Sequence, residues 1–321
     1  MDGPVVVTTA MISVPERARS LFKKAYIVAV IIAIAWALSG SGMDLAKAMD
    51  SLLVPQSAVY FLAWILMVAL LGLLWKAWLS HAEGVSLQAA EWIPVQAMAW
   101  AGRYLPGKIG LLMGKLALVQ RHRIDMRALV LSVFVEQAGF VLAGACVALL
   151  LFSPEELGAW QWLPPEFAKA WYWWMPVAVL VVVAAMPVMA AITARTLRCS
   201  RVASKSMQAA IFLVLHAIPH LAIGVAFYVL VIGLFPQAAS FPATHFVAVL
   251  ALAHIAGVLA VFAPAGFGVR EVVLAQGLRG VLSFEEALLL AAVLRVLTLL
   301  ADGTILLAVA VAWRKWRRGA T

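Results

Sequence analysis

Two stretches of the chain combine basic residues with proline and glycine in a pattern that could bind phosphate. They are GRYLPGKIG at residues 102–110 and FAPAGFGVRE at residues 262–271. A break of this kind starts a new helix, whose first N–H groups are free and carry a partial positive charge. Arginine grips phosphate through two parallel hydrogen bonds, whereas lysine acts as a point charge. The residues that we expect to hold a head-group phosphate are Arg103, Pro106, Gly107, Lys108, Gly266, Gly268 and Arg270.

The basic residues of the first stretch have a purely structural alternative. Arg103, Lys108 and Lys115 would also suit a cytoplasmic interface, where long side chains extend their charge toward lipid head groups. Arg270 differs, because it follows 64 consecutive residues, 206–269, without an Asp, Glu, Lys or Arg. A broken backbone and an ionisable residue are costly in lipid and are tolerated mainly where protein or water surrounds them. We therefore expect the second stretch to be the functional centre.

Four further ionisable residues are candidates for charge balance or proton coupling, namely Glu136, Glu271, Arg295 and Asp302. The two glutamates are expected to pair with Arg270, Arg295 or Arg103, and a structural ion pair is the alternative to a proton-coupling role. Arg295 and Asp302 lie seven residues apart, so they share one face of a helix. That face should look into the bundle, since a charge facing lipid is expensive.

The remaining motifs favour packing over chemistry. His216 and His220 have a spacing that can bind a metal, but no carboxylate lies between them and Pro219 disturbs the turn, so we expect no metal site. Gly110 and Gly114 predict close helix packing. The chain lacks the Gly-x-x-x-x-Gly-Lys-[Ser/Thr] pattern of nucleotide binding, so neither ATP nor another cofactor is expected.

The elements that position these residues must be membrane helices. The chain is 65% hydrophobic and only 12% charged, where soluble domains carry about 25% charged residues. The net charge of +9 does not indicate nucleic-acid binding, because the basic residues cluster beside apolar spans, as in cytoplasmic loops. The composition predicts an all-α polytopic membrane protein and leaves no room for a soluble catalytic domain.

The apolar runs predict about eight transmembrane helices. Between a cytoplasmic tail at 1–20 and a basic cytoplasmic tail at 316–321, a single bundle is expected over 21–315, with broken segments at about 91–122 and 262–282. Basic residues beside the first and last spans place both termini in the cytoplasm. That requires 264–282 to cross as a short broken helix, and a re-entrant loop is the alternative. The expected spans are about 25–43, 57–75, 128–152, 171–194, 206–235, 241–262 and 284–313.

The two halves of the chain resemble each other in outline. Glu136 lies 30 residues after Pro106, and Arg295 lies 31 residues after Pro264. Each half thus offers a broken segment and then a helix with a buried charge, of opposite sign in the two halves. Paired Gly/Pro-interrupted segments are a sequence indication of a transporter-like site at mid-membrane.

The same stretches carry a resemblance to a known family. GRYLPGKIG…GKLALVQR and PAGFGVREVVLAQGL, with Glu136 in a helix between them, resemble the lysylphosphatidylglycerol synthase transmembrane family over most of the chain. Ala265 stands where that family usually has glycine. The family includes the membrane half of the enzyme that makes and flips aminoacylated phosphatidylglycerol, and standalone proteins found with glycolipid and lipid-linked sugar pathways. No aminoacyltransferase domain is expected here, so the resemblance implies only the lipid-translocating half.

The favoured function is therefore a lipid flippase or transporter of the bacterial inner membrane, more a transporter than an enzyme. Its expected partner is an anionic phospholipid or a polyprenyl-phosphate-linked sugar, moved passively or with protons through Glu136 or Glu271. The alternative is an integral membrane enzyme, or an accessory subunit or scaffold for a glycosyltransferase, in a lipid-linked glycan or glycolipid pathway. Neither a metal-binding Asp cluster nor a Ser/His/Asp arrangement supports the enzyme.

Overall fold

The computed structural model describes residues 50–104, 109–116, 124–153, 166, 169–196 and 206–319. Contacts divide the chain after residue 45, and all of these residues belong to the second unit, 46–321. The regular elements in the described ranges are helices, joined by turns and one isolated bridge. The predicted tail at 1–20, the predicted span at 25–43 and the predicted site residues Pro106, Gly107 and Lys108 lie outside these ranges.

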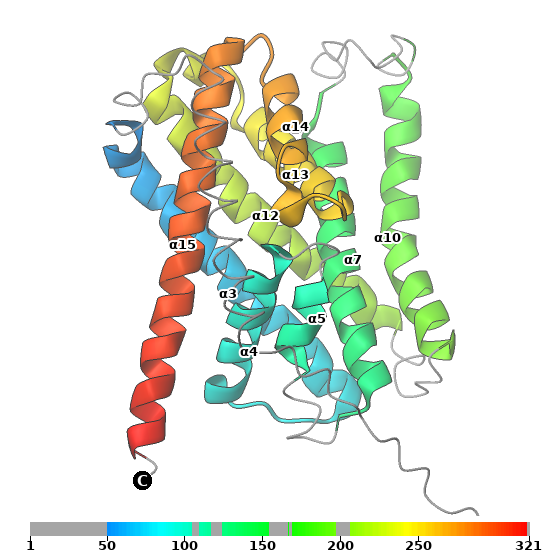
Figure 1. The fold of residues 1–321 in the computed structure, drawn as a ribbon. Coiled ribbons are helices and arrows are strands. Elements are labelled where there is room, and N and C mark those ends of the chain that lie inside the picture. The colour runs from blue at the N-terminus through cyan, green and yellow to red at the C-terminus, as the bar shows by residue number, and fades with distance from the viewer. Residues whose placement is uncertain are drawn as a thin grey trace, which may run out of the picture. The chain divides into compact units, whose positions relative to one another are not determined.

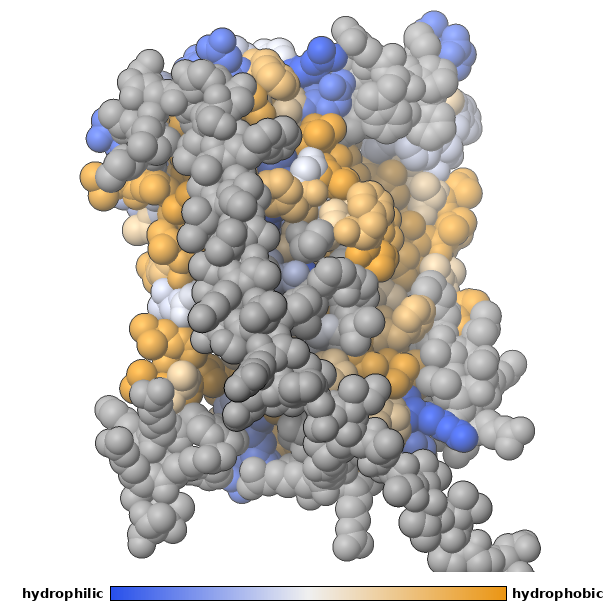
Figure 2. Space-filling view, in the orientation of Figure 1, coloured by the Kyte–Doolittle hydropathy of each residue, from blue (hydrophilic) through white to orange (hydrophobic). Residues whose placement is uncertain are grey.

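Four helices of the described part are long and apolar enough to cross a bilayer, which takes about 20 residues. They are α3 (Pro55–Glu83), α7 (Met126–Leu151), α12 (Ser206–Leu234) and α15 (Phe284–Gly319). Two further helices contain shorter apolar stretches. One stretch is part of α10 (Trp171–Thr196), and the other is the whole of α13 (Ala243–Leu259). Figure 2 shows apolar residues over the middle of one face, with hydrophilic residues toward its upper and lower ends. The protein is an all-α, multi-pass membrane protein, as the composition predicts.

The first broken segment is a helical hairpin. α4 (Ala89–Ala101) runs from the lower end of Figure 1 toward the middle, turns through η1 (Gly102–Tyr104), and α5 (Ile109–Lys115) returns. The two arms touch through backbone, because a Cβ on Gly110 would lie only 2.4 Å from the Gly102 carbonyl oxygen. A Cβ on Gly114 would lie 2.4 Å from the backbone nitrogen of Ala99. The predicted close packing at Gly110 and Gly114 is confirmed.

The second broken segment is also a hairpin, entering from the opposite end. α13 descends to η4 (Pro264–Gly266), and α14 (Val269–Gly277) climbs back (Figure 1). The turn uses left-handed backbone at three positions, with φ of 50° at Ala265, 71° at Gly266 and 82° at Gly268. At 1.5 Å per residue α14 is about 14 Å long, well short of a 30 Å hydrocarbon core. Residues 264–282 therefore re-enter instead of crossing, which was the alternative to a broken span.

The two hairpins belong to halves of opposite direction. α3 descends in Figure 1, the first hairpin rises and returns, and α7 ascends. α12 ascends, the second hairpin descends and returns, and α15 descends. The tips η1 and η4 contact each other. The internal repeat suggested by the sequence thus has the form of an inverted repeat, in which each half is a span, a hairpin and a span.

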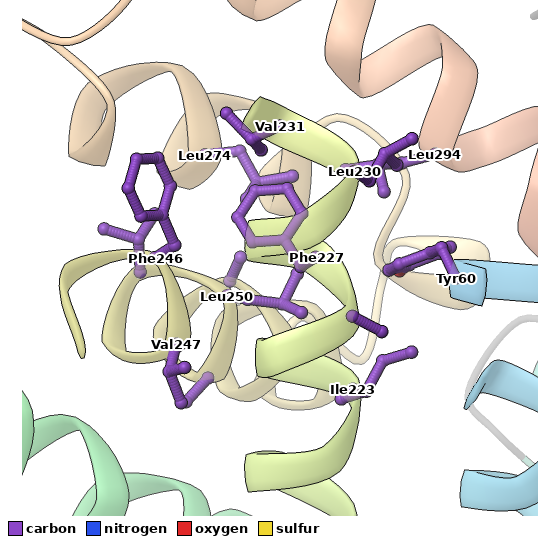
Figure 3. Packing of buried hydrophobic residues seen from close by; sticks show 14 of the residues in the cluster. Tyr60, Ile223, Phe227, Leu230, Val231, Phe246, Val247, Leu250, Leu274 and Leu294 are labelled. Carbon is purple, nitrogen blue, oxygen red and sulfur yellow. The ribbon is translucent and has the colours of Figure 1, made fainter. Parts of the chain in front are cut away.

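Large apolar side chains fix the helices that carry the hairpins. Figure 3 shows Phe227 of α12 on the side of α12 that faces Leu250 of α13, with Leu230 of α12 and Tyr60 of α3 on its other side. These four side chains are almost fully buried, at 0 to 1% exposed. Because α12 touches α3, α7 and α13, this cluster holds the second hairpin at a fixed position relative to the first half.

Candidate functional site

A cavity of about 70 Å³ lies where the hairpin tips meet, and its lining comes from both hairpins and from α3 and α7. Since a single water needs about 10–15 Å³, the cavity has room for about five waters or one small oxyanion. Its lining residues are Trp64, Met67, Leu71, Trp100, Arg103, Leu111, Glu136, Gln137, Phe140, His254, Gly257, Val258, Ala265 and Arg270.

Arg270, in the first turn of α14, is a buried cation that has no carboxylate partner among the described residues. It is 6% exposed, and its Nη2 donates a hydrogen bond to the Tyr60 hydroxyl at 3.2 Å. Its guanidinium carbon lies 5.6 Å from the centre of the Trp64 ring. Within the described part of the chain, the ion pairs leave Arg270 out. A buried charge without a counter-ion is costly, so this residue calls for an anion that the described part of the chain does not supply.

Arg103, at the first tip, is neutralised by Asp302 of α15. Arg103 Nη2 lies 2.5 Å from Asp302 Oδ2, and the guanidinium lies 4.4 Å from the centre of the Trp100 ring. Asp302 also accepts hydrogen bonds from Trp64 Nε1 at 2.9 Å, Trp100 Nε1 at 3.1 Å and the Tyr104 hydroxyl at 2.5 Å.

Lys115 of α5 pairs with Glu136 of α7, which also accepts a hydrogen bond from Gln96 Nε2 at 3.1 Å. Lys115 is fully buried, with Nζ 3.9 Å from the centre of the Trp75 ring. The prediction that Glu136 pairs with an arginine is wrong, because α5 folds back against α7 and brings Lys115 to it first.

The interface alternative for the first stretch also fails where the structure describes it. Lys115 is 0% exposed and the Arg103 side chain is 15% exposed. Both charges are turned into the bundle instead of extending toward lipid head groups, because each has a buried carboxylate within reach.

Glu271 and Arg295 form the third ion pair, as the sequence predicts. Arg295 Nη2 lies 3.0 Å from Glu271 Oε1 in the geometry of an ion pair and not of a hydrogen bond. The other oxygen, Oε2, accepts the Gly268 backbone N–H at 2.8 Å and caps α14. That N–H, which we expected to be free for phosphate, is thus already used. Gly266 and Gly268 shape the turn, and it is Ala265 that lines the cavity.

Among the described residues, the charges around the cavity therefore sum to one uncompensated positive charge. Three cations have carboxylate partners, and the fourth, Arg270, has none among the described residues. The predicted inward orientation of Arg295 and Asp302 is confirmed, since they are 8% and 5% exposed. Two of the ion pairs join a hairpin to the span that follows it, Lys115 of α5 to Glu136 of α7 and Glu271 of α14 to Arg295 of α15, with the signs reversed between the two halves.

Three residues of the site escaped sequence reasoning. Trp64 and Trp100 donate to Asp302, and tryptophans are so common in this sequence that nothing marked these two. His254 lines the cavity, is 6% exposed, and neither ring nitrogen has a hydrogen-bond partner in the described part of the chain. A histidine inside a long apolar run was the available signal. In contrast, His216 and His220 hydrogen-bond to the carbonyls of Phe212 at 2.6 Å and Phe140 at 2.9 Å.

Comparison of the chain with protein-family models, with curated proteins and with solved structures finds no match.

Proposed function

We propose that this protein is a flippase or transporter that moves the anionic head group of a lipid across the membrane. The observation that carries the proposal is Arg270, a buried arginine in a cavity between two hairpin tips, with no carboxylate partner among the described residues. A phosphate bound beside it would supply the missing negative charge through charge-assisted hydrogen bonds.

The arrangement of the hairpins supports transport over chemistry. Inverted repeats with broken helices that meet near the middle of the membrane are an architecture of secondary transporters, in which rocking of one half against the other alternates access to a fixed site. Here the tips η1 and η4 contact each other beside the cavity. The cavity is small, at about 70 Å³, so the proposal places only the phosphate there, with the acyl chains in lipid.

The proposal retains the sequence resemblance to the lysylphosphatidylglycerol synthase transmembrane family, with an anionic phospholipid or a polyprenyl-phosphate-linked sugar as cargo. It also retains the bacterial inner membrane as location and a cytoplasmic position of both termini. With the second hairpin re-entrant, α13 is an arm of that hairpin, so the predicted span at 241–262 does not cross. The predicted span at 25–43 and the helices α3, α7, α10, α12 and α15 then make six crossings, an even number, as two cytoplasmic termini require.

The test is leaflet exchange of labelled lipids in proteoliposomes. Wild type is compared with Arg270→Ala and with Arg127→Ala, a matched control whose side chain is exposed at the start of α7. Arg270→Ala is expected to lower protein-dependent exchange at least tenfold, and Arg127→Ala to leave it unchanged. Wild-type exchange by a folded Arg270→Ala variant, or exchange no faster than in empty vesicles for phospholipid and polyprenyl-phosphate cargo, would refute the proposal.

The same vesicles test the alternative of a membrane enzyme or an accessory subunit acting beside a glycosyltransferase. A chemically altered lipid in the product analysis would favour an enzyme. A lipid that changes leaflet without chemical change is the result that the flippase proposal requires.

A further inference from the structure

His254 of α13 lies beside Arg270 in the lining of the same cavity. The side chain is 6% exposed, and both Nδ1 and Nε2 lack a partner among the described residues. Its nearest ring neighbours are Trp64 at 5.8 Å, Phe140 at 6.2 Å and His220 at 6.2 Å between ring centroids. A buried imidazole with two unsatisfied nitrogens is costly, which points to a ligand or a proton that completes it.

An anion that enters the cavity changes the sign of the net charge around His254. The groups facing it are Arg270 from α14, Arg103 from η1, His220 from α12 and Glu136 from α7. Glu136 is already bound by Lys115, and Arg103 by Asp302, so Arg270 is the uncompensated charge that repels a proton on His254 in the empty cavity. An anion held by Arg270 reverses that field and attracts the proton.

We propose that His254 takes up one proton when an anion binds beside Arg270, so that the cavity selects a doubly charged phosphomonoester-like group together with a proton. The inference rests on the proposed function, because it concerns the same site. The proton adds to the lone pair of the neutral imidazole, and the resulting imidazolium then has two N–H donors, of which one can bond to an oxygen of the anion. No covalent bond to the ligand forms or breaks.

The charge balance explains the preference for a dianion. The described residues around the cavity leave one net positive charge, which matches a phosphodiester such as most phospholipid head groups carry. A phosphomonoester, whose second pKa is about 6, carries up to two negative charges near neutral pH. The second charge would remain uncompensated in a low-dielectric site unless His254 became positive. Protonation of His254 therefore extends the site from single to double charge.

The experiment measures sulfate binding to the purified protein between about pH 5 and pH 8, the range in which histidine changes charge. Sulfate is chosen because it stays a dianion throughout, so any pH dependence belongs to the protein. If one proton is taken up, the wild-type Kd should rise with pH by up to tenfold per unit. Calorimetry in buffers of different ionisation enthalpy should show about one proton bound per sulfate.

His254→Gln keeps a donor and an acceptor but cannot titrate. At low pH this variant should bind sulfate more weakly than wild type, with a higher Kd. Its Kd should not depend on pH, and binding should take up no proton. His245→Gln is the matched control, since His245 lies on the same helix but contacts the Gly277 carbonyl at 3.0 Å and does not line the cavity. It should keep the wild-type slope.

Two short-chain lipids, one with a phosphomonoester and one with a phosphodiester head group, separate a lipid from a free anion as the natural source. Proton uptake is expected with the phosphomonoester only, and a lipid cargo should outcompete sulfate. Sulfate binding that needs Arg270 but shows no proton uptake would overturn the role of His254 and leave the proposed function standing. Anion binding that is absent, or unchanged in Arg270→Ala, would overturn both.

Discussion

Arg103 Nη2 lies 2.5 Å from Asp302 Oδ2, and this contact ties the tip of the first hairpin to the last long helix of the second half. Asp302 accepts three more hydrogen bonds there, from Trp64, Trp100 and Tyr104. One carboxylate thus holds together α3, α4, η1 and α15, and its negative charge is what permits Arg103 to be buried.

Asp302→Asn should destabilise the protein strongly. The substitution leaves Arg103 buried without a counter-ion, and breaking a buried pair in this way costs about 3–5 kcal/mol. Thermal unfolding in detergent measures the effect. Asp50→Asn is the matched control, because Asp50 is exposed and should change stability little. Equal unfolding temperatures for Asp302→Asn and wild type would show that the pair does not support the fold.

Lys115 and Glu136 should behave as one unit in a double-mutant cycle. Lys115→Met leaves a buried carboxylate and Glu136→Gln leaves a buried ammonium, so each alone should be costly. The double variant leaves no charge, and its loss of stability should be smaller than the sum of the two single losses by about 1–3 kcal/mol. Additive losses would contradict the ion pair.

Gly110→Ala should open the first hairpin. Its Cβ would lie 2.4 Å from the Gly102 carbonyl oxygen and 2.5 Å from the Gly102 Cα, both backbone atoms that cannot swing away. We expect lower stability and loss of exchange activity. Gly303→Ala is the control within α15, where no atom lies within 4 Å of the added Cβ. That change should stabilise the helix by up to about 1 kcal/mol. Similar effects of the two substitutions would argue against the Gly–Gly contact.

Ala265→Gly should stabilise the protein, against the usual direction of an alanine-to-glycine change. Ala265 has a φ of 50°, a left-handed conformation that costs an alanine about 1 kcal/mol relative to glycine. Ala308→Gly on an exposed helical position provides the contrast, because glycine in a helix costs about 1 kcal/mol. We expect the unfolding temperature to rise in Ala265→Gly and to fall in Ala308→Gly. A lower unfolding temperature in both variants would mean that the turn is not strained at Ala265.

The sequence predicted the fold better than the pairing within it. Long apolar runs are enough to identify α3, α7, α12 and α15, and proline with glycine was enough to find both breaks. The re-entrant course of 264–282 was not decided by hydropathy, because a short apolar helix is compatible with crossing and with returning. It was decided by the nine-residue length of α14, which only the folded backbone reveals.

The sequence singled out most of the buried charges and the Glu271–Arg295 pair, but it did not give the partner of Glu136. Arg270, Glu271 and Arg295 could be selected because a charge inside an apolar run must face protein or water. The partner of Glu136 could not be found in this way, since Lys115 reaches it only after α5 folds back. The same rule does not select His254, because a neutral imidazole carries no charge.

Comparing Arg270→Met with Arg295→Met distinguishes an arginine that binds a ligand from one that stabilises the fold. Both arginines are buried, at 6% and 8% exposed. Arg295→Met deprives Glu271, whose side chain is 23% exposed, of its partner. It should lower the free energy of unfolding by about 1–3 kcal/mol. Arg270→Met removes a buried charge that has no carboxylate among the described residues, so stability should stay equal or rise even as exchange is lost. A residue that binds a ligand commonly lowers the stability of the empty protein in this way. Unfolding temperature and exchange rate, measured on the same preparations, give the comparison. If Arg270→Met unfolds at a lower temperature than Arg295→Met, then Arg270 supports the fold, and the argument for an anion site in the cavity fails.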